Sequence, residues 1–407
     1  MIDHEQALQT ILEHVKRHPV RSTPLEDTLG LALAKPVKAR LRMPRFDQSA
    51  MDGIAVRVAD VEGADPAAPV ALRLAGEIPA GSARTPRLRP GHAVKVFTGG
   101  PIPDGTEAVV VVERCRFEGD TVFVERAAMP GENVRRAGEE VARGDELLEA
   151  GTLITPPVVG LLALFGHETV PVRPRPRVAV ITMGDEVAGP GEKLGPHQIH
   201  DANGPALRAA LRGLGFDDLK SWRVDDRPRS LVRALKKALG TCDVVLTAGG
   251  ASVGDHDHVR AAREELGVRE LFARVAIKPG KPNVFGVGPK QVPVFSLPGN
   301  PVSAMVSFHR FVRPALWHMI GRTHEAALDS ATARLEARAK KKAGRLEWVR
   351  GAARWDGDTL VAHPVAAQGS HMLTGLARAD ALIELDREGE VFDEGSAVTL
   401  RWLRWFD

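Results

Sequence analysis

The stretch VAVITMGDE at residues 178–186 decides the fold of this 407-residue chain. Its first five residues are apolar or β-branched without interruption, which is typical of a strand buried on both faces of a sheet. Similar runs follow at 244–247 and 294–297, with helical patterns at 201–214, 230–239, 256–266 and from 301 onward. This order of strands and helices predicts a doubly wound, mostly parallel α/β sheet.

The sequence on either side of this sheet predicts an α/β and β multidomain protein. A stiff Pro- and Arg-rich stretch precedes the sheet at 173–177. Short apolar runs between Pro and Gly residues before it, and period-two alternation after it, indicate β structure. We predict a helical linking domain at 1–20 plus 141–172, a β-rich inserted domain at 21–140, the α/β domain at 173–322 and a small C-terminal β domain at 323–407. In the linking domain, the first helix is expected to pack with an apolar helix at 156–165.

Charge and cysteine content exclude several classes of protein. Fifty-five basic and 52 acidic residues leave a formal net charge of +3, too little for a nucleic-acid coat, so no nucleic-acid partner is expected. Two cysteines, Cys115 and Cys242, cannot supply an iron–sulfur cluster or a Cys-rich zinc site. The N-terminus lacks the pattern of a signal peptide, and the apolar stretch at 156–166 is too short to span a bilayer. We therefore expect no membrane partner and a cytoplasmic location.

Three loops that follow the predicted strands contain glycine or proline in unusual density. They are GDE at 184–186, GGASVG at 249–254 and PGNP at 298–301. Ligands of open α/β sheets bind beyond the carboxyl ends of the strands, and glycines let backbone N–H groups approach an anion. Any one loop is better explained as a tight turn, but three in one sheet favour a shared anion cleft. Its candidate residues are Gly249, Gly250, Ser252, Gly254, Pro298 and Pro301.

The segment IKPGKP at 277–282 carries two lysines, Lys278 and Lys281, in a loop stiffened by prolines. Such lysines are often only solvated surface charges in a turn. A stiff loop that presents two compact cations also suits an oxyanion, and we favour that interpretation. Neither a P-loop nor a complete G-x-G-x-x-G pattern occurs, which argues against ATP hydrolysis and NAD chemistry.

The acidic and histidine-rich segment DHDH at 255–258 resembles a set of metal ligands. Its simpler explanation is that acidic residues stabilise the start of a helix. Together with Glu186 and Asp225, which follow neighbouring strands, Asp257 completes a carboxylate set for a hard cation. Oxygen ligands favour magnesium over zinc.

The order of these motifs resembles the MoeA family of molybdopterin molybdenumtransferases, whose eukaryotic relatives include the E domain of gephyrin. The resemblance covers essentially the whole chain. It rests on the segments 46–53 (FDQSAMDG), 98–99 (TG), 135–140 (RRAGEE), 182–186 (TMGDE), 249–254, 278–282, 297–303 and 368–371 (QGSH). Each motif is weak or moderate alone, but the ordered series is specific.

The resemblance implies a function and a set of site residues. It implies an elongated homodimer whose active sites use both subunits, and insertion of molybdate into adenylylated molybdopterin with release of AMP and a requirement for Mg²⁺. Molybdopterin adenylyltransferase and molybdoenzyme maturation proteins are the implied partners. By motif position, the catalytic residues are Asp52, Thr98, Glu140, Glu186, Asp225 and Asp257, and the molybdate or substrate-anion set is Lys278, Lys281, Arg350 and Ser370.

Some positions leave alternatives open. Arg345 lies in the same segment as Arg350 and is an alternative anion ligand. Ile54 and Ala202 stand where the family usually has tyrosine and a hydroxyl residue, respectively, and Ala202 removes a helix-capping hydroxyl.

Other functions fit parts of the pattern. A pterin-binding scaffold without turnover, a molybdopterin adenylyltransferase or a nucleotide hydrolase on the same sheet are the alternatives. Release of AMP that depends on molybdate and magnesium distinguishes the transferase from the scaffold.

Overall fold

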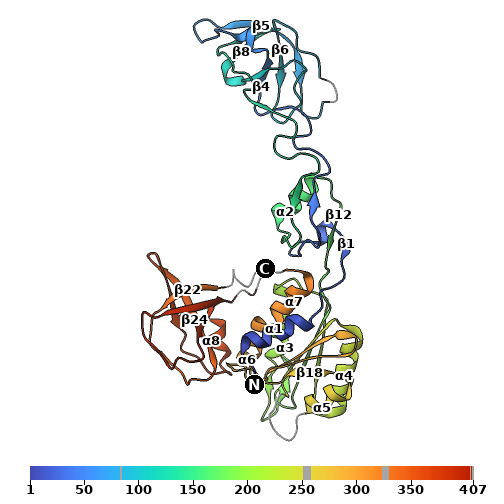
Figure 1. Ribbon diagram of the computed structural model, residues 1–407, viewed down its shortest axis with the longest axis vertical. Coiled ribbons are helices and arrows are strands. Elements are labelled where there is room, and N and C mark those ends of the chain that lie inside the picture. The colour runs from blue at the N-terminus through green and yellow to red at the C-terminus, as the bar shows by residue number, and fades with distance from the viewer. Residues whose placement is uncertain (83–84, 251–257, 323–329, 404, 406–407) are drawn as a thin grey trace. The chain divides into compact units, whose positions relative to one another are not determined.

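The computed structural model describes the chain except residues 83–84, 251–257, 323–329, 404 and 406–407 (Figure 1). The chain divides into two compact units. One comprises Met1–Lys35, Ala150–Ala163 and His167–Asp407, and the other, called the β unit here, comprises Pro36–Glu149 and Leu164–Gly166.

The larger unit contains the expected α/β sheet. Its strand order is β16 (Leu219–Val224), β13 (Val178–Met183), β17 (Val244–Ala248), β21 (Pro293–Leu297), β20 (Val284–Val287) and β18 (Arg269–Phe272). The first four strands are parallel, whereas β20 and β18 run antiparallel to their neighbours. The sheet is therefore mostly parallel, as expected, and its antiparallel edge of β20 and β18 makes it mixed. The segment between β20 and β21, residues 288–292, is too short for a crossover and can only reverse the chain.

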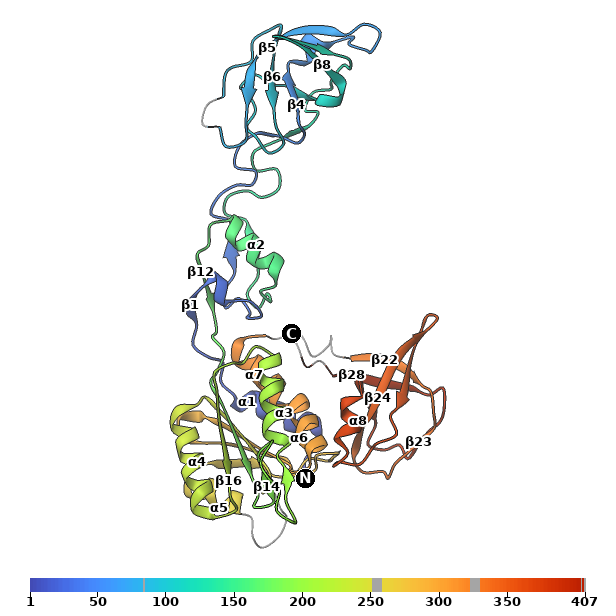
Figure 2. The same cartoon turned by 180° about the vertical axis from the view of Figure 1, so that it is seen from behind.

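Helices cover both faces of this sheet (Figures 1 and 2). On one face, α4 (Pro228–Thr241) and α5 (His258–Glu265) pack on alternate residues of β13, such as Ile181 and Met183. The other face carries α3 (Asn203–Gly213) and α6 (Pro301–Ser307). A π-helical turn, η5 (Phe308–Val312), joins α6 to α7 (Arg313–Ile320). Among the described residues, no helix is both apolar and long enough to cross a bilayer.

The first helix, α1 (His4–His14), does not follow the expected packing. Its buried residues Ala7 and Ile11 form a narrow stripe, and the helix packs against α7 and η5 of the α/β domain. The apolar helix α2 (Pro156–Leu164) instead lies beside the ribbon of β1 (Arg21–Pro24) and β12 (Thr169–Val172) (Figures 1 and 2). The linking segment is therefore a strand pair with one helix.

The β unit is a six-stranded sheet with apolar cores on both faces. Its strand order is β7 (Ala108–Val111), β4 (Gly53–Val56), β6 (His92–Val96), β5 (Val70–Ile78), β9 (Thr121–Val124) and β8 (Cys115–Glu118). Ile54 faces one core and Ala55 the other, so the strand β4, which is paired on both sides, is apolar throughout. Two short pairs extend the unit: β2 (Val37–Lys38) with β11 (Glu146–Leu148), and β3 (Gln48–Ser49) with β10 (Val134–Arg135).

The C-terminal segment forms a closed barrel. The ring of strands is β24 (Leu346–Asp356), β25 (Thr359–Pro364), β22 (Ser330–Leu335), β28 (Ala397–Trp402) and β26 (Ala381–Leu385), which pairs again with β24. A ribbon of β23 (Ala339–Lys340) and β27 (Val391–Phe392) and the short helix α8 (Leu373–Ala377) complete it. The two-residue strand β19 (Ile277–Lys278), which comes from the α/β domain, pairs in parallel with β24.

The remaining short elements are the strand pair β14 (Val187–Ala188) and β15 (Ile199–His200), and the 3₁₀ turns η1 (Leu25–Asp27), η2 (Val58–Val61), η3 (Val112–Arg114) and η4 (Pro289–Gln291).

Candidate functional site

A cleft of about 570 Å³ opens at the carboxyl ends of β13, β17 and β21. The three strand-end loops predicted from the sequence all contribute to it. Predicted residues in its lining are Glu186, Gly249, Gly250, Pro298 and Pro301, joined by Asp201, Ala202, Asn203, Ser303 and His371 among others. The structure therefore brings one residue set from three separate motifs into a single cavity.

The backbone at Gly249 and Gly250 requires glycine. Their φ angles are +98° and +64°, a region that side chains rarely adopt. A Cβ atom at Gly249 would overlap the carbonyl oxygen of Met183 on the neighbouring strand. The loop after β17 can therefore lie close to β13 and expose its backbone to the cleft.

Two polar side chains fix the rim of this cleft. The Asn203 amide donates a hydrogen bond of 2.7 Å to the Gly299 carbonyl oxygen. Asp201 accepts hydrogen bonds from the Gly204 N–H at 2.9 Å and from the Thr182 hydroxyl at 2.9 Å. Asp201 thus caps the start of α3, a role that Ala202 cannot take. These two polar residues were not predicted from the sequence to belong to the site, although both flank Ala202.

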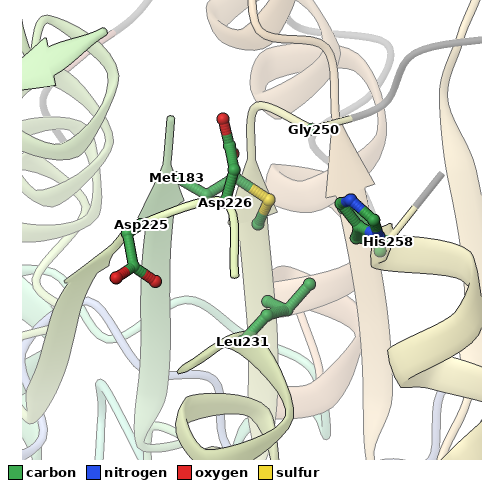
Figure 3. A pocket seen from close by; sticks show the side chains of 7 residues that line it. Met183, Asp225, Asp226, Leu231, Gly250 and His258 are labelled. Carbon is green, nitrogen blue, oxygen red and sulfur yellow. The ribbon is translucent and has the colours of Figure 1, made fainter. Parts of the chain in front are cut away.

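A second hollow, of about 340 Å³, shares Met183 and Gly250 with the cleft and is lined by Asp225 and Asp226 (Figure 3). Figure 3 shows the two carboxylates pointing in different directions, with His258 on the other side of the hollow. Carboxylate groups and an imidazole ring therefore border the same hollow.

Asp225 and Asp226 have different partners. The Ser230 hydroxyl and the Arg227 N–H, which is 3.3 Å away, lower the pKa of Asp225 from its ordinary value. Asp226 accepts a hydrogen bond from the Asp185 N–H at 3.2 Å, and its own N–H donates to the Asp185 carboxylate at 3.3 Å. The loops after β13 and β16 are thus tied together by Asp185, which lies in the predicted GDE segment, and by Asp226, which was not predicted. The acidic doublet at 225–226 was the available signal.

The expected metal ligands are only partly described. Glu186 lines the cleft and Asp225 the second hollow, while Asp257 lies outside the described residues, as do Ser252 and Gly254. Within the described ranges, no group of three His, Cys, Asp or Glu side chains is placed to hold a metal ion.

The two lysines of the segment 277–282 are placed differently. Lys278 forms an ion pair of 2.8 Å with Glu347 and lines a third cavity, of about 380 Å³, with Lys340, Lys341, Lys342 and Arg345. Lys281 is exposed, and the next residue, Pro282, lines the cleft. The lysine loop therefore runs from this cavity, called the basic hollow here, to the cleft.

Arg350 and Ser370 contribute through loop contacts. Arg350 is 2% exposed, and its Nη2 donates to the carbonyl oxygens of Ala367 at 2.9 Å and Gly369 at 3.3 Å. Burial lowers the pKa of Arg350. The Ser370 hydroxyl accepts a hydrogen bond of 3.0 Å from the Asn300 amide on the cleft rim. Arg345, the alternative to Arg350, lines the basic hollow.

The remaining predicted residues belong to the β unit. Asp52 Oδ1 accepts hydrogen bonds from the Thr98 N–H at 2.7 Å and the Thr98 hydroxyl at 2.8 Å, which lower the pKa of Asp52. Glu140 is exposed, and its N–H donates to the Met43 carbonyl oxygen. Ile54 is fully buried in β4, so the position has no exposed side chain to offer a ligand.

Three models of known protein families together match most of the chain. The MoeA N-terminal region (domain I and II) matches residues 2–166, a probable molybdopterin binding domain matches 179–318, and the MoeA C-terminal region (domain IV) matches 332–401.

Full-length relatives agree with these matches. Molybdopterin molybdenumtransferase 2 of Mycobacterium tuberculosis is 37% identical over 90% of this chain and 91% of its own. Molybdopterin molybdenumtransferase of Bacillus subtilis is 32% identical over 98% and 94%, respectively. A crystal structure of the molybdopterin biosynthesis moea protein from Pyrococcus horikosii superposes with a TM-score of 0.81 at 31% identity, covering 99% of both chains. The chain therefore belongs to the MoeA family of molybdopterin molybdenumtransferases, a family of molybdenum cofactor biosynthesis.

Proposed function

We propose that this protein inserts molybdate into adenylylated molybdopterin and releases AMP, with Mg²⁺ required. The observation that carries this proposal is the course of the lysine loop. Lys278 lines the basic hollow, while Pro282, four residues later, lines the cleft with its glycine-rich strand ends. An oxyanion held by this loop would lie next to a ligand in the cleft.

The cleft itself suits the phosphate groups of the adenylylated pterin. Gly249 and Gly250 line the cleft where a Cβ atom would not fit, and Gly250 is exposed, so a phosphate can approach the backbone closely. The hydrogen bonds that Asn203 donates to Gly299 and that Asp201 accepts from Gly204 hold the neighbouring loops in place before a ligand arrives. We assign substrate orientation to this part of the site.

Carboxylate oxygens are the ligands that magnesium prefers, and Glu186 and Asp225 provide them on adjacent loops. Both residues follow strands whose last residues, Met183 and Val224, are paired in register. We propose that these two carboxylates and Asp257 hold the ion, which would neutralise charge on the phosphate groups. Asp226 and Asp185 keep the two loops together.

The oxyanion is proposed to contact Lys278 and Lys281, with Arg350 and Ser370 shaping the adjoining loop. Arg350 holds the backbone at Ala367 and Gly369, and Ser370 is bonded to the cleft residue Asn300. The dithiolene sulfurs of the substrate would bind the metal atom of molybdate, so the chain needs no thiolate of its own. Cys242, which is buried, and Cys115, whose pKa burial raises to about 12, fit that expectation.

We also propose a homodimer in which Asp52, Thr98 and Glu140 of one subunit serve the cleft of the other. These residues belong to the β unit, and the cleft residues belong to the larger unit. Molybdopterin adenylyltransferase and molybdoenzyme maturation proteins are the proposed partners, because the substrate must be adenylylated before this step and the product must be delivered after it.

The decisive experiment measures AMP release from adenylylated molybdopterin by the full-length chain. We expect release only when both molybdate and Mg²⁺ are present, and a Lys281→Ala variant should need more molybdate for the same rate. Tight pterin binding without AMP release would instead identify a scaffold. Consumption of ATP with molybdopterin would identify an adenylyltransferase.

A further inference from the structure

The second residue of the chain pairs with the segment that leads into the lysine loop. The Ile2 N–H donates to the Arg274 carbonyl oxygen at 3.1 Å, and the Ile2 carbonyl oxygen accepts from the Ala276 N–H at 2.7 Å. Ile2 thus forms a parallel bridge with Val275, which lies between these two residues and is fully buried. The N-terminus therefore supplies a backbone partner to the segment 274–276.

The same short segment also holds the lysine loop and the barrel. The Val275 N–H donates to the Lys281 carbonyl oxygen at 3.0 Å, a bond that closes the loop. The Ala276 carbonyl oxygen accepts from the N–H of Leu346, the first residue of β24, at 3.0 Å. Ile2, the lysine loop and β24 are therefore linked through three consecutive residues.

His4, two residues after Ile2, contacts β24 through its side chain. The centroids of the His4 and Trp348 rings are 5.6 Å apart and their planes meet at 85°, which is an edge-to-face contact. Trp348 is fully buried, and the guanidinium carbon of Arg310 lies 5.4 Å from the centroid of its ring. A tryptophan enclosed in this way has little freedom to shift, so its contact with His4 fixes the start of α1 against the barrel.

The helix α1 is itself anchored in the α/β domain. The Asp3 carboxylate caps the helix by accepting a hydrogen bond of 2.8 Å from the Gln6 N–H. Ala7 and Ile11 are buried where α1 packs against α7 and η5. The helix thus gives Ile2 and His4 a fixed base from which they reach the loop segment and the barrel strand.

We propose that Ile2 and His4 form a clasp that positions the lysine loop against β24, with His4 as the positioning residue. The clasp follows from these contacts, and only its effect on AMP release rests on the proposed function. The clasp acts through the backbone of 274–276 and the ring of Trp348. A loop held in one position before a ligand arrives loses less conformational freedom when it binds.

Hydrogen exchange of the full-length chain tests the clasp without a ligand. In His4→Ala the edge contact is lost, and exchange should become roughly three- to tenfold faster at the amides of Val275, Ala276 and Leu346. Strand β13 of the α/β sheet should keep its wild-type rate, and Gln9→Ala, at an exposed position of α1, is the matched control. Unchanged exchange at the three amides, or equal acceleration in β13, would overturn the proposal.

Two further variants separate the parts of the clasp. His4→Phe keeps a ring against Trp348 and should restore slow exchange at the three amides. Ile2→Pro removes the N–H that bonds to Arg274 but leaves the His4 ring, and it should speed exchange at the same amides. A His4→Phe variant that exchanges as fast as His4→Ala would show that the ring contact holds nothing in place.

The clasp should also depend on pH. Burial lowers the pKa of His4 from its ordinary value of 6.5 and the charge of Arg310 adds to this, whereas Glu384, Glu5 and Asp3 act in the opposite direction. The contribution of neutral His4 is therefore complete above pH 6.5 and is lost as pH falls from 6.5 toward the folded-state value. Protection of the three amides should fall by at most about tenfold per pH unit in this range. His4→Phe should show no such fall, and identical pH profiles of the two proteins would contradict the role of His4.

AMP release connects the clasp with the proposed function. At pH 7.5, His4→Ala should need roughly two- to fivefold more molybdate for half of its maximal rate, with the maximal rate little changed, and His4→Phe should behave as wild type. An unchanged molybdate requirement in His4→Ala would mean that the clasp does not position the loop. If the wild-type chain releases no AMP but the exchange results hold, the clasp stands and the proposed function falls.

Discussion

The Glu384 carboxylate shows how one partly buried charge is stabilised in the barrel. Its Oε2 atom accepts hydrogen bonds from Arg401 Nε at 3.0 Å and from Trp348 Nε1 at 3.4 Å. Burial alone would raise the pKa of this carboxyl, but the bond and the charge of Arg401 outweigh burial, so the pKa lies below its ordinary value. Glu384 is therefore ionised in the folded protein at neutral pH.

Replacing Glu384 with Gln should lower the free energy of unfolding by about 1–3 kcal/mol at pH 7. The depressed pKa in the folded state means that the contribution is present above the unfolded value of 4.5 and is lost as pH falls through the folded value. The gap between wild type and Glu384→Gln should therefore narrow below pH 4.5 in urea denaturation. A gap that stays constant with pH would contradict this account, and Glu394→Gln at an exposed position is the control.

At the scale of elements, strand β4 depends on a residue without a side chain. Gly53 pairs with Val96 on one side and Val111 on the other. A Cβ atom at this position would overlap the carbonyl oxygen of Val110, which is backbone and cannot rotate away. The glycine is therefore needed where the segment 46–53 enters the sheet.

A Gly53→Ala variant should destabilise the β unit by about 1–3 kcal/mol or more, because the strands must separate to admit the methyl group. Thermal unfolding followed by limited proteolysis should show cleavage within 36–149 at lower temperature than in wild type. Gly160→Ala is the control, because α2 has open space at that position and alanine favours a helix. Equal stability of both variants would show that β4 tolerates the side chain.

Much of the α/β domain was predictable because its strands are long, apolar and followed by helices. The antiparallel edge was not, because β18 and β20 are only four residues each and their direction depends on a short reversal that leaves no hydrophobic pattern. The strand β19 has two residues and is defined by its partner β24, so local sequence holds no signal for it. The closure of the barrel likewise depends on pairing between distant strands.

The candidate cleft was predictable at the level of loops, and less so at the level of side chains. Glycines at 249–250 and prolines at 298 and 301 mark strand ends, and the carboxyl ends of parallel strands meet at one edge. The different placement of Lys278 and Lys281 could not be predicted, because it depends on the barrel that pairs with β19. The role of Asp226 depends equally on a partner, Asp185, that lies 41 positions away.

At the scale of the whole molecule, the proposed homodimer predicts complementation between inactive chains. Asp52→Asn alters the β unit and Lys281→Ala alters the larger unit. In a mixed dimer with shared sites, one site carries both changes and the other carries neither. Because purification through both tags retains only mixed dimers, each with one intact site of two, about half of the wild-type rate of AMP release should return.

The measurement uses differently tagged chains that are co-expressed and purified through both tags. Each variant alone, and a mixture of preformed homodimers, are the controls. If activity of the mixed dimer does not exceed that of the parent variants, the residues of one site come from one chain.

The pairing of β19 with β24 has a thermodynamic consequence. Ile277 lies opposite Leu346, and the Leu346 N–H donates to the Ala276 carbonyl oxygen at 3.0 Å. The lysine loop and the barrel strand β24 therefore open and close together. The free energy of ligand binding to the loop is thus linked to the free energy of opening β24. An oxyanion that holds Lys278 should slow hydrogen exchange at the Leu346 amide. Equally, a substitution that loosens β24 should speed ligand release, although it touches no ligand.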